Sequence, residues 1–161
     1  MTKAGDTMWS PTHGRVSFDE MYSIIKEFIC ELPEYEYEIT VGSDSQNHEL
    51  TKTVLCIAVW RKGKGGIYFA DTRYSKIITN IRQKLIHETS LSLELALKIT
   101  DRFKNDEVDC NITAIHVDAG NKGPTSRYIS EIVGWVKACG FDCRIKPDSY
   151  CASSIADRVS K

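Results

Sequence analysis

Apolar residues recur along the chain at two spacings, one typical of helices and the other of strands. Ser17 followed by Glu20 has the pattern of a helix capping box, and the apolar residues after it keep helical spacing up to Pro33. The helical spacing predicts helices over residues 17–32, 80–104, 125–140 and 153–161, the last being the start of a terminal helix. Alternating or β-branched segments predict strands over residues 36–42, 51–61, 66–74, 110–120 and 141–146.

The order of these segments predicts an α/β fold. Short connections join the first three strands, which is typical of an antiparallel meander, and helices then alternate with the last two strands. We therefore expect a mixed sheet flanked by helices, with an extra N-terminal helix. Residues 1–16 are expected to be a loose N-terminal arm, and residues 17–161 a single domain.

Composition narrows the class of protein. The chain has 161 residues, of which 42% are hydrophobic and 27% charged, as in ordinary globular proteins. No run of eighteen apolar residues predicts a membrane span, and no apolar segment near Met1 resembles a secretory signal, so we expect a cytoplasmic protein without a membrane partner. In that compartment the six cysteines are expected to be free thiols.

The net charge of −1 argues against binding nucleic acid by overall charge, although a local basic patch can lie on a neutral protein. Two basic segments stand out, residues 61–66 and 75–84. The first is more typical of a glycine-rich hairpin turn, and its spacing does not match a phosphate-binding P-loop.

Two aspartates follow apolar strand segments. Asp44 lies in "ITVGSDSQNH" and Asp118 in "AIHVDAGN". Each could be an ordinary turn residue or helix cap, since Gly, Ser, Asn and Asp are common turn formers. Each could equally be a ligand at the carboxyl end of a strand, where ligands gather in open α/β sheets.

Two glutamates lie on the helix between these aspartates. On a helical wheel Glu88 lies beside the apolar stripe that should face the sheet, whereas Glu94 falls on a mostly polar face. Glu88 is therefore the better candidate for an inward carboxylate, with Glu94 left as the alternative. Asp157 lies in the expected terminal helix, where it could also be an acid favoured by the helix dipole.

Four carboxylates gathered from these elements have a clear chemical use. Packed together they would repel one another, and a cation relieves that repulsion. Mg²⁺ prefers a few carboxylate oxygens and keeps waters or phosphate oxygens. Two such ions about 4 Å apart can activate water and stabilise the leaving oxygen of a phosphodiester. His48 and His116 lie near the aspartates and could move protons, although a single His is more often structural.

The order of motifs from "VGSDSQ" to "ADRVS" resembles the ribonuclease H-like superfamily and, within it, the YkuK-type family. The resemblance implies a five-stranded mixed sheet with its second strand antiparallel to the rest. It implies Mg²⁺ or Mn²⁺ as cofactor and cleavage of a phosphodiester in RNA, RNA–DNA hybrid or branched DNA. The residues that it implies as catalytic metal ligands are Asp44, Glu88, Asp118 and Asp157.

Two other functions fit the same residues. One is a catalytically weak or inactive module that binds nucleic acid or protein, which the near-neutral charge favours. The other is a hydrolase of small nucleotide substrates, which would not need a basic groove. The fold alone does not choose among these functions.

Overall fold

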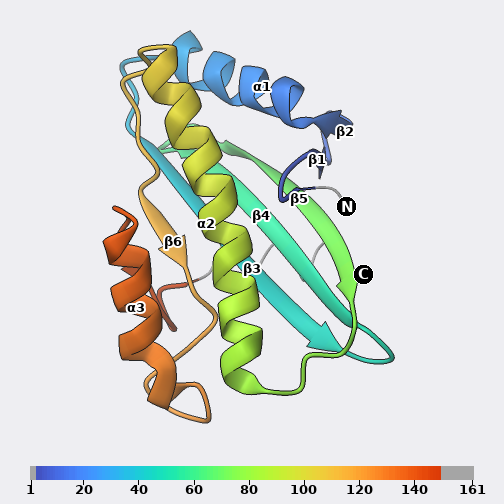
Figure 1. Ribbon diagram of the computed structural model, residues 1–161. Helices are drawn as coiled ribbons and strands as arrows, with labels where there is room; N and C mark the ends of the chain where they lie inside the picture. Colours follow the sequence, from blue (N-terminus) through green and yellow to red (C-terminus); the bar gives the residue numbers. More distant parts are fainter. Residues whose placement is uncertain (1–2, 150–161) are drawn as a thin grey trace.

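A computed structural model describes residues 3–149 (Figure 1). The start of a terminal helix expected over residues 153–161, with Asp157, lies outside the described residues. The strands are β1 (Thr7–Ser10), β2 (Gly14–Ser17), β3 (Tyr37–Asn47), β4 (Thr51–Arg61), β5 (Gly66–Ser75), β6 (Ala114–His116) and β7 (Cys143–Arg144). The helices are α1 (Phe18–Glu31), α2 (Ile81–Asn105) and α3 (Ile129–Ala138), with a 3-10 turn, η1 (Ser126–Tyr128), before α3.

The strands form one mixed sheet in the order β2-β1-β5-β4-β3-β6-β7. Strand β4 is antiparallel to both neighbours, β3 and β5, whereas β3, β6 and β7 are parallel. The expected five-stranded core, with its second strand antiparallel to the rest, is confirmed. The sheet has seven strands rather than five because β1 and β2 extend it beyond β5.

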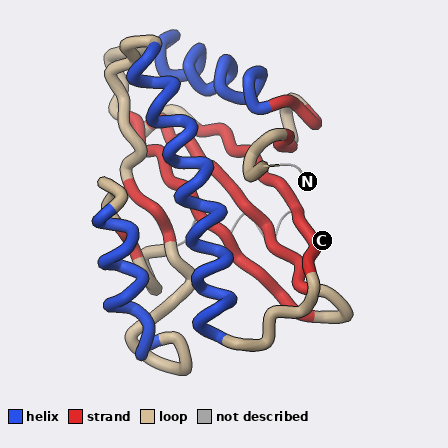
Figure 2. Tube along the Cα trace, viewed as in Figure 1, coloured by secondary structure: helices blue, strands red, loops and turns tan. Residues whose placement is uncertain are grey.

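The three α-helices lie against one face of the sheet (Figure 2). Helix α2 crosses the central strands, with its main contacts on β3, and packs beside α3. Alternate residues of the strands face these helices and form the main core, including Ile39, Val41, Leu55, Ile57 and Phe69 against Leu95, Ile99 and Ile132. None of the helices within residues 3–149 has the length and apolar character needed to span a membrane.

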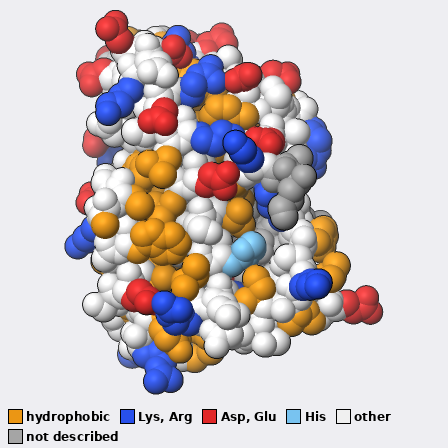
Figure 3. Space-filling model, in the orientation of Figure 1, with side chains coloured by type: hydrophobic (Ala, Val, Ile, Leu, Met, Phe, Trp, Pro, Cys, Tyr) orange, Lys and Arg blue, Asp and Glu red, His pale blue; other side chains and the backbone are white. Residues whose placement is uncertain are grey.

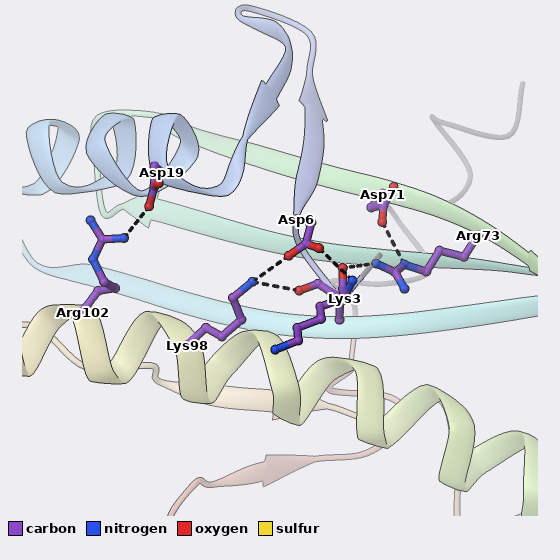
Figure 4. Close-up of polar contacts among 8 residues, drawn as sticks. Lys3, Asp6, Asp19, Asp71, Arg73, Lys98 and Arg102 are labelled. Atoms are coloured by element: carbon purple, nitrogen blue, oxygen red, sulfur yellow. Dashed lines mark hydrogen bonds and ion pairs between the residues drawn. The ribbon is translucent and has the colours of Figure 1, made fainter. Parts of the chain in front are cut away.

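The N-terminal residues differ from the loose arm expected for residues 1–16. Residues 7–17 form the β1–β2 hairpin, and Trp9 pairs with Ala70 on β5. The segment before β1 is fixed to helix α2, because the Lys98 ammonium lies 3.3 Å from an Asp6 carboxylate oxygen (Figure 4). The hairpin buries Met8 completely, and this burial gives the short strands the tertiary support that their length alone does not provide.

Strand β3 is longer than expected. The sequence predicted that it ends at Gly42, with turn formers after it, but pairing with β4 continues from Tyr37↔Arg61 to Asn47↔Thr51. Asp44 therefore lies within the strand and pairs with Val54. The hydrogen-bonded ladder overrides the local preference of Gly, Ser and Asp for turns.

The capping box predicted at the start of α1 is confirmed. The Ser17 hydroxyl accepts a hydrogen bond from the Glu20 amide at 3.1 Å, and a Glu20 carboxylate oxygen accepts one from the Ser17 amide at 3.2 Å. Both interactions satisfy amides that the first turn of a helix leaves unpaired.

Replacing Ser17→Ala should lower the free energy of unfolding by about 1 kcal/mol, since it removes the capping hydroxyl and leaves the Glu20 amide dependent on water. Urea denaturation of the variant and the wild type measures this difference. Ser23→Ala is the matched control, because Ser23 is exposed in the middle of the same helix, where alanine has the better helix propensity. Equal destabilisation by both substitutions would contradict the capping role.

Candidate functional site

Asp44 and Asp118 come from neighbouring parallel strands at the same level of the sheet. Gly42 on β3 pairs with His116 on β6, and each aspartate lies two residues further along its strand direction. Strand β6 has ended by then, so the two carboxyl groups meet beside the open edge of β3. The side chains of Asp44 and Asp118 are hydrogen-bonded to each other.

Small hydroxyl residues let helix α2 approach β3 closely at this level. The Ser43 and Ser92 hydroxyl oxygens are 2.8 Å apart and share a buried hydrogen bond. One turn nearer the helix start, the Ser45 hydroxyl donates to a carboxylate oxygen of Glu88. Glu88 is only 5% exposed, and the charges of the two aspartates act on it, whereas Glu94 is half-buried elsewhere on the helix. The structure thus brings Asp44, Glu88 and Asp118 together, and not Glu94.

The hydrogen-bonded aspartates share one proton. Burial, the hydrogen bond with Asp118 and the charge of Asp118 raise the pKa of Asp44 to about 7. Burial also acts to raise the pKa of Asp118, but the hydrogen bond from Asp44 and the Lys146 ammonium outweigh it and lower that pKa. The proton therefore resides on Asp44, and Asp118 carries the negative charge.

Glu88 also holds a proton near neutral pH. Burial raises the pKa of Glu88 to about 8, and the charges of Asp44 and Asp118 act in the same direction. The hydrogen bond from Ser45 and the charge of Lys84 oppose this increase without overcoming it. The three carboxyl groups are thus packed too tightly to ionise together.

Two lysines that the sequence did not single out as site residues border these carboxyl groups. The Lys146 ammonium lies 2.8 Å from Asp118 Oδ1, and its backbone amide donates to the Ala119 carbonyl at 2.8 Å. Lys84 lies one turn before Glu88 on α2 and is half-buried. Lys146 is the last residue of the segment predicted as the final strand. Its position at the end of a strand next to that of Asp118 is the feature of the sequence that could have identified it as a site residue.

A cavity of about 220 Å³ opens beside the carboxyl groups. Its lining includes Ile81, Lys84, Glu88, Asp118, Thr125 and Lys146. A larger cavity of about 480 Å³ near Tyr37, lined by Cys30 and Cys110 among others, contains none of the predicted site residues. The smaller cavity therefore borders Glu88 and Asp118.

The donor set fits a hard divalent cation in its chemistry. Carboxylate oxygens from three different elements converge, and such oxygens are the ligands that Mg²⁺ prefers. Among residues 3–149, no group of three or more His, Cys, Asp and Glu side chains is arranged so that it could already hold a metal ion. Binding would require Asp44 to lose its proton and Lys146 to move away from Asp118.

The two histidines near the aspartates have different surroundings. His48 is exposed in the turn after β3. His116 is buried, and burial together with the charge of Arg144 lowers its pKa to about 4. The His116 ring is therefore neutral near pH 7 and belongs to the interior of the sheet.

Stability should fall as the pH rises from about 5 to about 9 in the presence of EDTA. The folded pKa values of Asp44 and Glu88 lie above those of the unfolded chain, so the stabilisation is complete below pH 4 and is lost as the pH rises through about 7 and 8. Glu88→Gln should flatten this part of the curve of melting temperature against pH. Glu94→Gln, on the same helix, should leave the curve unchanged, and the same slope in both variants would contradict the charge cluster.

Comparison with known proteins agrees with this architecture. A family model described as ribonuclease H-like matches residues 20–161. The chain is similar to the uncharacterized protein YkuK of Bacillus subtilis (strain 168), with 30% identity over 162 residues that cover 93% of this chain and 94% of that relative. No solved structure matches the chain significantly. The resemblance seen in the sequence is confirmed, and the chain belongs to the ribonuclease H-like family.

Proposed function

We propose that the protein is a metal-dependent nuclease that hydrolyses phosphodiester bonds of nucleic acid. The observation that carries the proposal is the convergence of Asp44, Glu88 and Asp118 beside a cavity bordered by two lysines. Three carboxyl groups that cannot all ionise alone form a site whose charge a divalent cation completes. Membership of the ribonuclease H-like family supports the same reading.

The residues have distinct roles in this proposal. Asp44 and Asp118 would hold Mg²⁺ or Mn²⁺, with Glu88 as a ligand from the helix and Asp157 as a ligand from the terminal segment. When bound, the metal supplies a nucleophilic water and stabilises the charge that develops on the phosphate. Lys84 and Lys146 contact phosphate oxygens and keep the nucleic acid in the cavity.

The chain itself controls the protonation state of the site. Asp44 must lose its proton before it can act as a ligand, and the raised pKa of Asp44 places that loss near neutral pH. Ser45 donates to Glu88 and fixes the direction of the glutamate side chain. Activity therefore depends on the hydroxyl residues of β3 as well as on the carboxyl groups.

Asp44→Asn should reduce metal-dependent cleavage by about 100-fold or more, since loss of even an outer partner of a metal ligand costs about 10- to 100-fold. Cleavage is measured on single-stranded RNA, RNA–DNA hybrid and branched DNA with Mg²⁺ or Mn²⁺. Titration calorimetry with each metal alone should show binding to the wild type that Asp44→Asn loses. Glu94→Gln is the control and should keep both properties.

The outcomes separate the alternatives. Metal binding without cleavage of any polynucleotide, together with hydrolysis of free nucleotides, would favour a hydrolase of small substrates. Nucleic-acid binding that persists while neither metal binds at millimolar concentration would favour a binding module. Cleavage by Asp44→Asn at the wild-type rate would contradict the proposed site.

Lys146→Met should tighten the binding of Mg²⁺, because the ammonium lies 2.8 Å from Asp118 Oδ1 and competes with the cation for that oxygen. Titration calorimetry gives the dissociation constant, which we expect to fall about 3- to 10-fold on loss of one nearby positive charge. Lys122→Met, in the exposed loop after Asp118, serves as the control and should have little effect. Weaker binding by Lys146→Met would show that the lysine supports the metal rather than competing with it.

A further inference from the structure

A row of side chains lies next to Asp44 on the same face of the sheet. Asp44 pairs with Val54, and Val54 pairs with Thr72 on β5. Residues directly opposite in antiparallel strands point to the same face, as do residues two apart in one strand. The next row on this face is therefore Gln46, Lys52 and Tyr74, which pair in turn across β3, β4 and β5.

This row carries an exposed aromatic ring, while Lys52 within it is half-buried. Tyr74 is 65% exposed, the largest fraction among the exposed large hydrophobic side chains of the described residues. From the spacings of a sheet, Tyr74 lies roughly 12 Å from Asp44, two strands across and two residues along. We call Gln46, Lys52, Tyr74 and the nearby Lys76 the Tyr74 surface.

The loop beside the Tyr74 surface is held in place. The Asn47 side-chain amide donates to the Ile78 carbonyl at 2.9 Å, and the Ile78 amide donates to the Thr51 hydroxyl at 2.8 Å. Thr51 in turn donates to the Asn47 side-chain oxygen at 2.6 Å. The apolar side chain of Ile77 is nevertheless 44% exposed, so this fixed loop presents an apolar group to solvent beside the aromatic ring.

The charge of this region is positive. Residues 72–87 contain Arg73, Lys76, Arg82 and Lys84 and no acidic residue. Arg82 is paired with Glu131 and Arg73 with Asp71, and the acidic residues Asp71 and Glu88 flank this range in the sequence. Figure 3 shows the opposite, helix-covered face of the molecule, on which basic, acidic and apolar side chains are intermingled.

We propose that the Tyr74 surface binds an unpaired segment of the nucleic acid that enters the Asp44 site. This inference rests on the proposed function and names its substrate class as single-stranded. Tyr74 stacks on a base, Gln46 offers hydrogen bonds, and Lys76 neutralises a phosphate. Ile81 and Lys84 line the cavity beside the carboxyl groups.

Single-stranded rather than double-stranded nucleic acid fits the chemistry of the surface. An exposed aromatic ring gains affinity by stacking on a base face, and a duplex keeps its base faces covered by neighbouring pairs. Duplex binding depends mainly on many phosphate contacts, and this surface offers few lysines. The aromatic ring is therefore the main source of affinity.

The experiment measures binding without cleavage. Fluorescence anisotropy in EDTA follows a labelled single-stranded RNA of twelve nucleotides and the same strand in an RNA–DNA hybrid. Tyr74→Ala should weaken binding of the single strand about 10-fold, from the loss of one stacked base, and Tyr74→Phe should retain it. Lys76→Gln should reduce the slope of log K against log salt concentration by about 0.7.

Matched controls come from the far end of the same sheet face. Trp60 is 47% exposed and lies on β4 roughly 25 Å beyond Lys52, and Lys64 is exposed in the turn after it. Trp60→Ala and Lys64→Gln should leave the binding of the single strand unchanged. Circular dichroism melts of all variants check that each one is folded.

Three outcomes would overturn the proposal. They are single-strand binding that Tyr74→Ala leaves unchanged, equal losses in Tyr74→Ala and Trp60→Ala, and tighter binding of the hybrid than of the single strand. Failure of the nuclease proposal is distinct, because it requires Asp44→Asn to cleave normally or the wild type not to cleave. If the protein binds single strands through Tyr74 without cleaving them, the binding inference stands and the nuclease proposal fails.

Discussion

The close approach of helix α2 to strand β3 determines the candidate site. Ser43 and Ser92 meet across this interface at 2.8 Å, a separation that only small side chains allow. The approach carries Glu88 to the Ser45 hydroxyl and to the neighbourhood of Asp44, which projects on the other face of the same strand. A large apolar residue at position 43 or 92 would overpack this interface and separate the glutamate from the aspartates.

Burying Glu88 next to two aspartates has an electrostatic cost. Glu88 is buried in the interface, and the pKa of Glu88 is raised to about 8 because its charged form loses hydration and faces two acidic neighbours. Two contacts reduce the repulsion between the carboxyl groups. Asp44 and Asp118 share a proton, and the Lys146 ammonium pairs with Asp118. In the proposed function a bound cation would displace both.

Much of this architecture follows from patterns that are local in the sequence. The capping box of α1 depends on Ser17 and Glu20, three residues apart, and the orientation of Glu88 follows from the apolar stripe of its own helix. The alternation of helices and strands after β5 predicts a mixed sheet flanked by helices. Each of these predictions depends only on the spacing of residues within one helix or strand, so a short stretch of sequence is enough to make it.

The features that the sequence did not predict depend on partners far along the chain. Strand β3 continues through Asp44 because β4 supplies a ladder as far as Thr51, although Gly42 and Ser43 favour turns locally. The β1–β2 hairpin depends on burial of Met8 and on Lys98, more than eighty residues away. Lys146 meets Asp118 only after β6 and β7 have paired. The role of Asp157 stays a prediction, because that residue lies outside residues 3–149.

The near-neutral charge of the chain constrains how it can hold a polynucleotide. A net charge of −1 gives no long-range attraction to phosphate, so affinity has to come from short-range contacts close to the carboxyl groups. Arg73 is paired with Asp71 and Arg82 with Glu131, so the positive charge available between β5 and α2 is mainly that of Lys76 and Lys84. Two lysines that neutralise phosphates release few counterions from a nucleic acid, so they add little affinity. Stacking on an exposed ring is much less dependent on salt, and it requires a base without a neighbour on one face. A weakly charged protein of this fold is therefore better suited to unpaired segments than to continuous duplex.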